Sequence, residues 1–335
     1  MIMGKSRKEN IKKITSIGGS ALIEGIMMRG PKKTMVAVRT GKDDIYTEEI
    51  PFVSLPSRFP IFKVPLIRGF GGLIDSMRLS YKALMISADK AMESIPEDEQ
   101  EEPSKLEKWI DEKMGDSFIK ILMVISMIFG IAIAVLLFFM TPTWLYNHLS
   151  DALKTKEGMS WVSDRFFRSA FEGIIRIVLF LLYIIVCSQM QDMKRVFQYH
   201  GAEHKTIFCY ESDEELTVEN VKKHTRFHPR CGTSFIVIML LVGIIIGLFI
   251  PITNPVLRSV VKILLLPVTC GIGYEFIKIC GRYDNAITKV IAFPGLLAQR
   301  ITTREPDEHM IEVAIKAMKA VIPENGEDIL KKKED

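Results

Sequence analysis

Four long apolar stretches limit the fold of this chain more than any other feature. Residues 121–140 and 177–190 contain no charged side chain, and the stretches 235–250 and 256–277 are separated only by residues 251–255. About twenty apolar residues are needed to cross the hydrocarbon core of a bilayer. The pattern therefore predicts an α-helical polytopic membrane protein with about four transmembrane helices.

The four stretches differ in how well they fit one crossing. The first is long enough by itself, the second becomes so when it takes in residues 171–176, and the third is slightly short. Arg258, Lys262 and Pro267 interrupt the fourth, and polar or proline-broken segments are tolerated only where protein or water covers them. Residues 235–277 therefore form either two full spans or a re-entrant hairpin.

The orientation in the membrane is predicted from the N-terminal region. It carries five basic residues within the first thirteen but no apolar signal segment, so we expect no cleavable secretion signal. More than a hundred largely polar residues before the first span then stay in the cytosol. With an even number of spans, the segment 191–233 and the C-terminal tail are cytosolic too.

The N-terminal part, residues 1–95, is predicted to be a small mixed α/β cytosolic module. Residues 34–50 alternate around Gly41 and indicate a β-hairpin. The glycine-rich segment 18–31, with Glu24 and Arg29 as its charged residues, is either a strand corner or a binding loop.

Helical spacing of apolar residues continues over 71–92, which predicts an amphipathic helix. We expect its apolar stripe, which includes Met77, Tyr81 and Met85, to pack in a core or bundle, with the membrane surface as another possibility.

The remaining boundaries follow from shifts in composition. Residues 96–117 read as an acidic linker, 118–278 as the membrane domain with its cytosolic segment 191–233, and 279–335 as a cytosolic tail. Pro306 suits the first turn of a helix in that tail, and Lys331–Asp335 is expected to fray.

The segment between the second and third spans carries the most specific chemical pattern. In His200-Gly-Ala-Glu203-His204, positions i, i+3 and i+4 share one helix face, so two imidazoles can bind one metal ion. The order His-x-x-Glu-His is also the inverted metalloprotease signature, in which the carboxylate activates a water on the metal. The alternative is that these are helix-surface histidines near a membrane.

A second group follows closely in the sequence. Pro229 disfavours helix at His228, so His228-Pro-Arg-Cys231 is expected to form a turn. The predicted metal ligands are His200, His204, His228 and Cys231, with Glu203 as the candidate catalytic base. Further candidate residues are Glu211, Glu275, Asp284, Glu24 and Arg29.

Ligand chemistry indicates a divalent transition metal, most simply zinc. The five cysteines, Cys187, Cys209, Cys231, Cys270 and Cys280, are an odd number and suggest no disulfide framework. A net charge of +4 with mixed signs gives no indication of nucleic-acid binding. The lipid bilayer is the expected partner, a membrane protein is a further candidate, and the oligomeric state is open.

Four motifs in this order carry a family resemblance. They are Gly18-Gly-Ser-Ala-Leu-Ile-Glu-Gly-Ile-Met-Met-Arg-Gly-Pro31, Tyr199-His-Gly-Ala-Glu-His-Lys205, His228-Pro-Arg-Cys-Gly-Thr-Ser234 and Thr302-Thr-Arg-Glu-Pro306. The chain resembles the YqhQ-like family of bacterial membrane proteins with a domain of unknown function. The resemblance implies a multi-pass protein of the bacterial cell membrane and a metal-dependent one, with the polar motif residues at its site.

Two classes of function follow. If four protein groups bind the ion, the site is closed and structural, and the protein is a membrane scaffold or accessory factor, for example for translocation or biogenesis machinery. If only three bind, the fourth position is open and Glu203 can act as a base in hydrolysis at the membrane surface. Transport ranks last, because the spans show no internal repeat.

Overall fold

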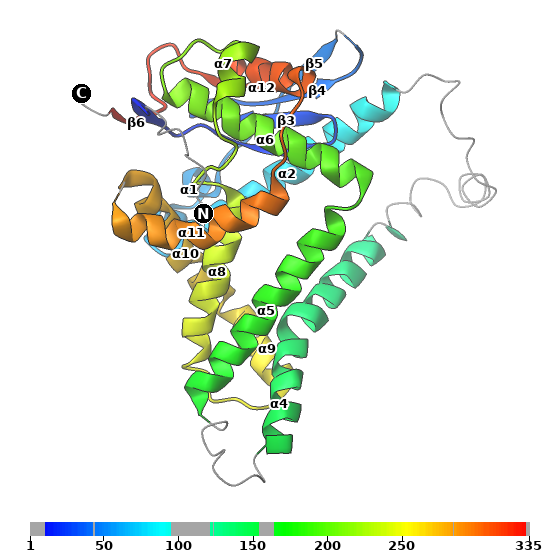
Figure 1. The fold of residues 1–335 in the computed structure, drawn as a ribbon, viewed down its shortest axis with the longest axis vertical. Coiled ribbons are helices and arrows are strands. Elements are labelled where there is room, and N and C mark those ends of the chain that lie inside the picture. Colours follow the sequence, from blue (N-terminus) through cyan, green and yellow to red (C-terminus); the bar gives the residue numbers. More distant parts are fainter. Residues whose placement is uncertain are drawn as a thin grey trace, which may run out of the picture. The chain divides into compact units, whose positions relative to one another are not determined.

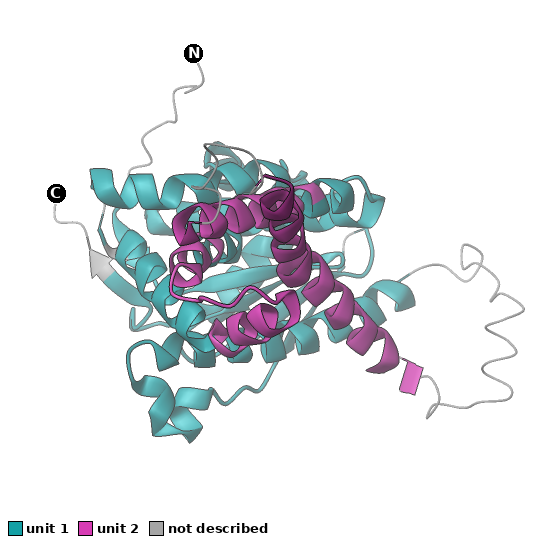
Figure 2. Cartoon of the chain, turned by 90° about the horizontal axis from the view of Figure 1, so that it is seen from below, with its two compact units in different colours: residues 1–94, 183–239, 267–335 teal, residues 95–182, 240–266 magenta. Residues whose placement is uncertain are grey.

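The computed structural model describes residues 11–42, 44–94, 121–122, 124–153, 164–283 and 285–332. The chain divides into two compact units, coloured separately in Figure 2. Unit 1 contains residues 1–94, 183–239 and 267–335, and unit 2 contains residues 95–182 and 240–266. The predicted acidic linker at 96–117 and the candidate Asp284 lie outside the described residues.

A four-stranded antiparallel sheet forms the centre of unit 1. Its strands follow chain order, β2 (Gly18–Leu22), β3 (Gly25–Arg29), β4 (Thr34–Arg39) and β5 (Ile45–Glu49). The predicted hairpin over 34–50 is confirmed as β4 and β5, with Val38 opposite Tyr46. Successive side chains of a strand point to opposite faces, and β3 is buried on both. Helices therefore cover both faces of the sheet.

One face packs against two helices, α6 (Gln191–Glu211) and α12 (Glu308–Val321), as Figure 1 shows. Ile26 and Met28 of β3 join Ala202 and Ile207 of α6 in this core. The other face packs against α2 (Ile67–Glu93), where Met27 and other strand residues meet Leu79 and Ala83. The site described below is built on α6.

The rest of unit 1 surrounds these layers. It contains the strands β1 (Lys13–Thr15) and β6 (Ile329–Lys332), the short α1 (Leu55–Arg58) and η1 (Pro60–Lys63), and the helices α7 (Val218–Lys223), α10 (Leu266–Arg282, whose first residue belongs to unit 2) and α11 (Ala286–Thr302). Thr217 caps α7 as its Oγ1 accepts a hydrogen bond from the Asn220 N–H. Asp307 caps α12 in the same way.

Unit 2 consists of apolar helices. Its elements are the π-turn η2 (Leu136–Met140), α4 (Thr141–Leu153), α5 (Arg165–Cys187, up to Leu182) and α9 (Pro255–Leu264). The helix α8 (Gly232–Gly247) belongs partly to each unit. The π-turn ends two residues before Pro142, whose missing N–H interrupts the regular helical hydrogen bonds.

Spanning length is reached by fewer helices than predicted. Within the described residues, Val124–Leu153 and Arg165–Cys187 are long and apolar enough to cross a membrane. The pair Pro255–Leu264 and Leu266–Gly281 passes only as one unit and is bent by 51°, while Gly232–Gly247 is shorter. The part of the chain that the structure describes thus has two helices of spanning length, or three if the bent pair is one span.

Two local expectations were wrong. The apolar stripe of α2 is exposed, with Met77, Tyr81 and Met85 at 65, 59 and 38% exposure, because the helix turns its smaller residues toward the sheet. The expected frayed tail, 331–335, begins instead within β6, which pairs with β1 so that Lys13 lies opposite Lys332, and residues 333–335 lie outside the described residues.

Candidate metal centre

The helix α6 presents His200 and His204 on one face, with ring centroids 4.4 Å apart. Glycine between them is required by close packing, because a Cβ at Gly201 would lie 2.0 Å from the carbonyl oxygen of Arg304. The helix therefore approaches the segment after α11 more closely than any other residue type allows.

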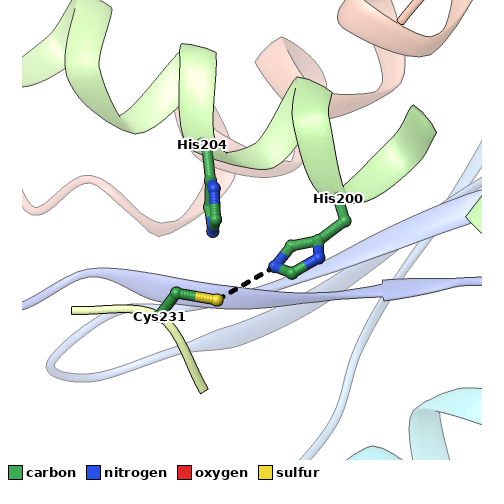
Figure 3. A group of neighbouring side chains, drawn as sticks. All are labelled: His200, His204 and Cys231. Carbon is green, nitrogen blue, oxygen red and sulfur yellow. Dashed lines mark hydrogen bonds between the residues drawn. The ribbon is translucent and has the colours of Figure 1, made fainter. Parts of the chain in front are cut away.

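Cys231 completes the group from the turn that precedes α8. Its Sγ lies 3.2 Å from Nε2 of His200, the contact drawn in Figure 3. One ligand atom from each of His200, His204 and Cys231 lies within 4.8 Å of the other two. The backbone N–H of Thr233 donates to the same sulfur at 3.3 Å, which fixes the thiol side chain.

Backbone carbonyls orient both imidazoles. Nδ1 of His200 lies 2.8 Å from the Thr302 carbonyl oxygen, and Nδ1 of His204 lies 2.5 Å from that of Arg226. A carbonyl can only accept, so each Nδ1 carries a proton, and Nε2 is the nitrogen of each ring that is left to bind a metal ion. Metal-binding histidines are held in this way, with the second nitrogen hydrogen-bonded to a carbonyl or carboxylate. The donor set thus fits a metal ion.

The electrostatics of the group favour a thiolate. Burial alone would raise the pKa of the Cys231 thiol, but His200 and His204 lower it well below its usual value. Burial lowers the pKa of His200, yet the Cys231 sulfur and the Glu203 carboxylate raise it to about 9. A metal ion binds the thiolate and neutral imidazoles, so its binding releases the shared proton.

Glu203 also lies on α6, and its side chain is hydrogen-bonded to strand β2 of the sheet. Its Oε1 accepts a hydrogen bond from the Gly19 N–H of β2 at 3.0 Å. The side chain is buried, and burial raises the pKa of its carboxyl group. A carboxyl group in such a setting is suited to accept and return a proton.

A cavity of about 1230 Å³ opens onto these side chains. Its wall includes His200, Glu203, His204 and Cys231, together with residues 14–21, the end of α10 and Leu330. All of its lining residues belong to unit 1. The candidate ligands and the candidate base therefore line the same cavity.

His228 and Glu211 belong to a neighbouring network instead of the ligand group. Nε2 of His228 is 3.8 Å from Glu211, which also accepts hydrogen bonds from the Thr15 N–H at 2.8 Å and from Arg230. Burial lowers the pKa of His228 to about 4. Its ring centroid lies 5.5 Å from that of His204. The structure thus brings together three of the four predicted ligands and places His228 beside them.

Three further candidate site residues, Glu24, Glu275 and Arg29, make contacts outside the ligand group. Glu24 accepts two hydrogen bonds from the Arg195 guanidinium, and Glu275 accepts two from that of Arg68. Arg29 lies 5.0 Å from the ring of Phe52, on the α2 side of the sheet.

Sequence reasoning missed the groups that orient the site. These are the carbonyl groups of Thr302 and Arg226 and the N–H of Gly19, which have no signature in side-chain identity. It also missed that Cys209, Glu214 and His224 form a second group within 4.8 Å, in which Glu214 is exposed. The repeated i, i+4 spacing of His224 and His228 was the only available signal.

Comparisons with known proteins give a family and no activity. The family model described as "Protein of unknown function (DUF1385)" matches residues 64–324. The protein is similar to "Uncharacterized protein YqhQ" of Bacillus subtilis (strain 168), with 32% identity over 307 residues, which cover 91% of this chain and 92% of that one. No solved structure matches. The matched family model and this relative, which confirm the resemblance seen in the motifs, show that the chain belongs to the DUF1385 family of YqhQ-like proteins.

Proposed function

We propose that this protein is a multi-pass membrane protein with a zinc-type metal centre at His200, His204 and Cys231, and that it acts as a metal-dependent hydrolase. The observation that carries the proposal is the position of three ligand atoms, within 4.8 Å of one another, on the wall of a large cavity. Structural zinc sites are closed by four protein ligands, whereas catalytic ones have three and an open position.

The residues around the centre have separable roles in this proposal. A divalent ion would supply Lewis acidity at the cavity wall. Glu203 would accept a proton from the attacking water and pass it to the leaving group, since its raised pKa favours reversible transfer. The carbonyl groups of Thr302 and Arg226 would hold the imidazoles in the tautomer that binds metal.

Membrane location is supported by the two spanning-length helices, whose most apolar windows have mean hydropathies of 2.7 and 2.4. An even number of crossings is supported by the pairing of β1 with β6, because segments from both ends of the chain then lie in one compact unit. Four spans, counting α8 and the bent pair, or two spans and a re-entrant hairpin, both satisfy this condition. Both termini and the segment 191–233 would then face the cytosol, in the membrane of a bacterial cell.

Metal analysis of the purified full-length protein tests the site. We expect about one transition-metal ion per chain, and its loss in the variants His204→Ala and Cys231→Ala. His309→Ala is the matched control, because the His309 side chain is 64% exposed and far from the ligand group in sequence. Unchanged metal content in both ligand variants would refute the site.

A substitution at His228 distinguishes an open site with three protein ligands from a closed site with four. If only three residues bind, His228→Gln keeps the ion, whereas a closed four-ligand site loses it. Loss of the ion in His228→Gln, with α6 still folded, would favour the structural site of a scaffold or accessory factor. Retention supports the open centre.

A further inference from the structure

The surface formed by α1, η1 and the outer face of α2 has no role in the metal centre. It contains a cleft of about 400 Å³, lined by Pro51, Phe52, Val53, Leu55, Arg58, Arg78 and Lys82. Four of the lining residues are apolar, and the only charged ones among them are the cations Arg58, Arg78 and Lys82. We call these residues the basic cleft.

Positive charge is in excess around the basic cleft. Arg29 and Arg78 lie 5.0 and 5.8 Å from the ring of Phe52, so a fourth cation adjoins the three that line the cleft. Among the described residues, the one ion pair of these four cations joins Arg78 to Asp75 at 3.7 Å. Asp75 is itself buried, and its other oxygen accepts the Leu55 N–H at 2.9 Å. The cleft therefore attracts an anion.

An exposed apolar stripe runs beside the cations. Arg78 and Lys82 are one turn apart on α2, and the neighbouring positions 77, 81 and 85 carry Met, Tyr and Met, each exposed. The connection before α2 adds Phe59 and Ile61, at 46 and 57% exposure. Cations beside an apolar face are typical of segments that lie in the interface of an anionic bilayer. A soluble anion would make no use of the apolar stripe.

The start of α2 packs against α10, an apolar helix of unit 1. A Cβ at Gly271 of α10 would lie 2.2 Å from the carbonyl oxygen of Leu66, and one at Gly69 would lie 2.7 Å from the side chain of Tyr274. Arg68 binds Glu275 of α10 through two hydrogen bonds. Because α10 is part of the bent apolar pair, the start of α2 is held against a segment proposed above to enter the membrane, and Arg78 and Lys82 of the basic cleft lie further along the same helix.

We propose that the basic cleft binds the head-group phosphate of an anionic phospholipid, while Met77, Tyr81 and Met85 enter the interface beside it. This inference rests on the membrane location proposed above and is independent of the metal. The guanidinium groups of Arg58 and Arg78 and the ammonium group of Lys82 would contact the phosphate oxygens. The protein would thereby hold its cavity-bearing unit against the bilayer surface.

Lipid binding can be measured with the full-length protein in a non-ionic detergent. Fluorescent phosphatidylglycerol and phosphatidylcholine with the same acyl chains are titrated, and anisotropy gives each affinity. Each basic residue near an anionic surface contributes about fivefold in binding. The triple variant Arg58→Gln, Arg78→Gln and Lys82→Gln should therefore bind phosphatidylglycerol about 100-fold more weakly. The control variant Lys33→Gln, Lys42→Gln and Lys319→Gln removes three exposed lysines elsewhere and should bind like the wild type.

The proposal is supported if wild type prefers phosphatidylglycerol and only the cleft variant loses this preference. Equal binding of both lipids, or an unchanged cleft variant, would overturn it. Competition by inorganic phosphate at the concentration of the lipid would overturn it as well, because the ligand would then be a soluble phosphate compound. Hydrogen exchange of α2 and α6 shows whether the variants are folded. Membrane fractionation tests the location separately, so absence of the protein from membranes is distinguished from loss of lipid preference.

Discussion

Replacing Gly201 with alanine tests the close packing on which the proposed metal centre would depend. The new Cβ would lie 2.0 Å from the Arg304 carbonyl oxygen, and ordinary contact begins near 3.4 Å, so the backbones must separate by about 1.4 Å. The Arg304 N–H donates to the Phe197 carbonyl at 2.8 Å, and this hydrogen bond resists the separation. The close approach at Gly201 therefore helps to position Thr302, whose carbonyl oxygen orients His200.

The expected cost follows from three contributions. Overpacking costs about 1–3 kcal/mol and a weakened hydrogen bond about 1 kcal/mol, while alanine in place of glycine returns about 1 kcal/mol of helix propensity. The net destabilisation is about 1–3 kcal/mol. Gly72→Ala in α2 is the matched control, because nothing lies within 4 Å of its added Cβ. That variant should be more stable than the wild type by about 0.5–1 kcal/mol.

Hydrogen exchange measured by mass spectrometry is the appropriate assay. It follows the amides of α6 directly, and α6 contains no tryptophan whose fluorescence could be used instead. A destabilisation of about 1–3 kcal/mol accelerates exchange of the amides in 191–211 by about 5- to 150-fold. Exchange as slow in Gly201→Ala as in Gly72→Ala would refute the packing argument. Reduced metal content in Gly201→Ala alone would confirm that the packing supports the site.

Three further outcomes are expected. Glu203→Gln should keep its metal but lose function in a complementation assay, and retained function would exclude Glu203 as the base. Burial lowers the pKa of His228 from 6.5 to about 4, so the metal-free protein should lose stability as the pH falls from about 6.5 to about 4, and should lose more than His228→Gln does. Denaturant titrations at pH 6.5 and pH 5 that show the same loss in both proteins would contradict this. In a Cys187→Ser background, where the other cysteines are buried, an impermeant maleimide should label Asp164→Cys and not Glu215→Cys in intact cells. The reverse labelling would refute the topology.

The parts of unit 1 that were predictable are those specified by local signals. The helix over 191–211 follows from its spacing, Thr217 from its capping chemistry, and the turn before Cys231 from Pro229. Each depends on contacts within a few residues. These signals also placed His200 and His204 on one face of α6.

Periodicity gave the helical state of α2 but the wrong buried face. Both sides of this helix carry apolar residues, and the sheet packs against the side with Leu79, Ala83 and Ser87. Smaller side chains let the helix lie closer to the sheet. Counting apolar positions takes no account of side-chain size, so it does not identify this face as the buried one. The larger Met77 and Tyr81 are left exposed, and this is the observation that led to the proposed lipid surface.

The exact ligand group was not predictable, because it depends on contacts between distant segments. His228 was expected to bind metal, yet Glu211 is drawn to Arg230 and to the Thr15 N–H, more than 190 residues away in sequence, and His228 packs beside that carboxylate. No local pattern distinguishes this arrangement from a fourth ligand.

The ligand group joins three segments that local signals leave independent. His200 and His204 come from α6, Cys231 precedes α8, and the carbonyl group of Thr302 ends α11. A metal ion bound only to the folded arrangement stabilises all these contacts at once, by about 2.7 kcal/mol when its concentration is 100 times its dissociation constant. The same ion can therefore maintain the fold of unit 1 and leave one coordination position open. Stabilisation of the fold by metal is thus no evidence against catalysis, and the behaviour of Glu203 remains the deciding measurement.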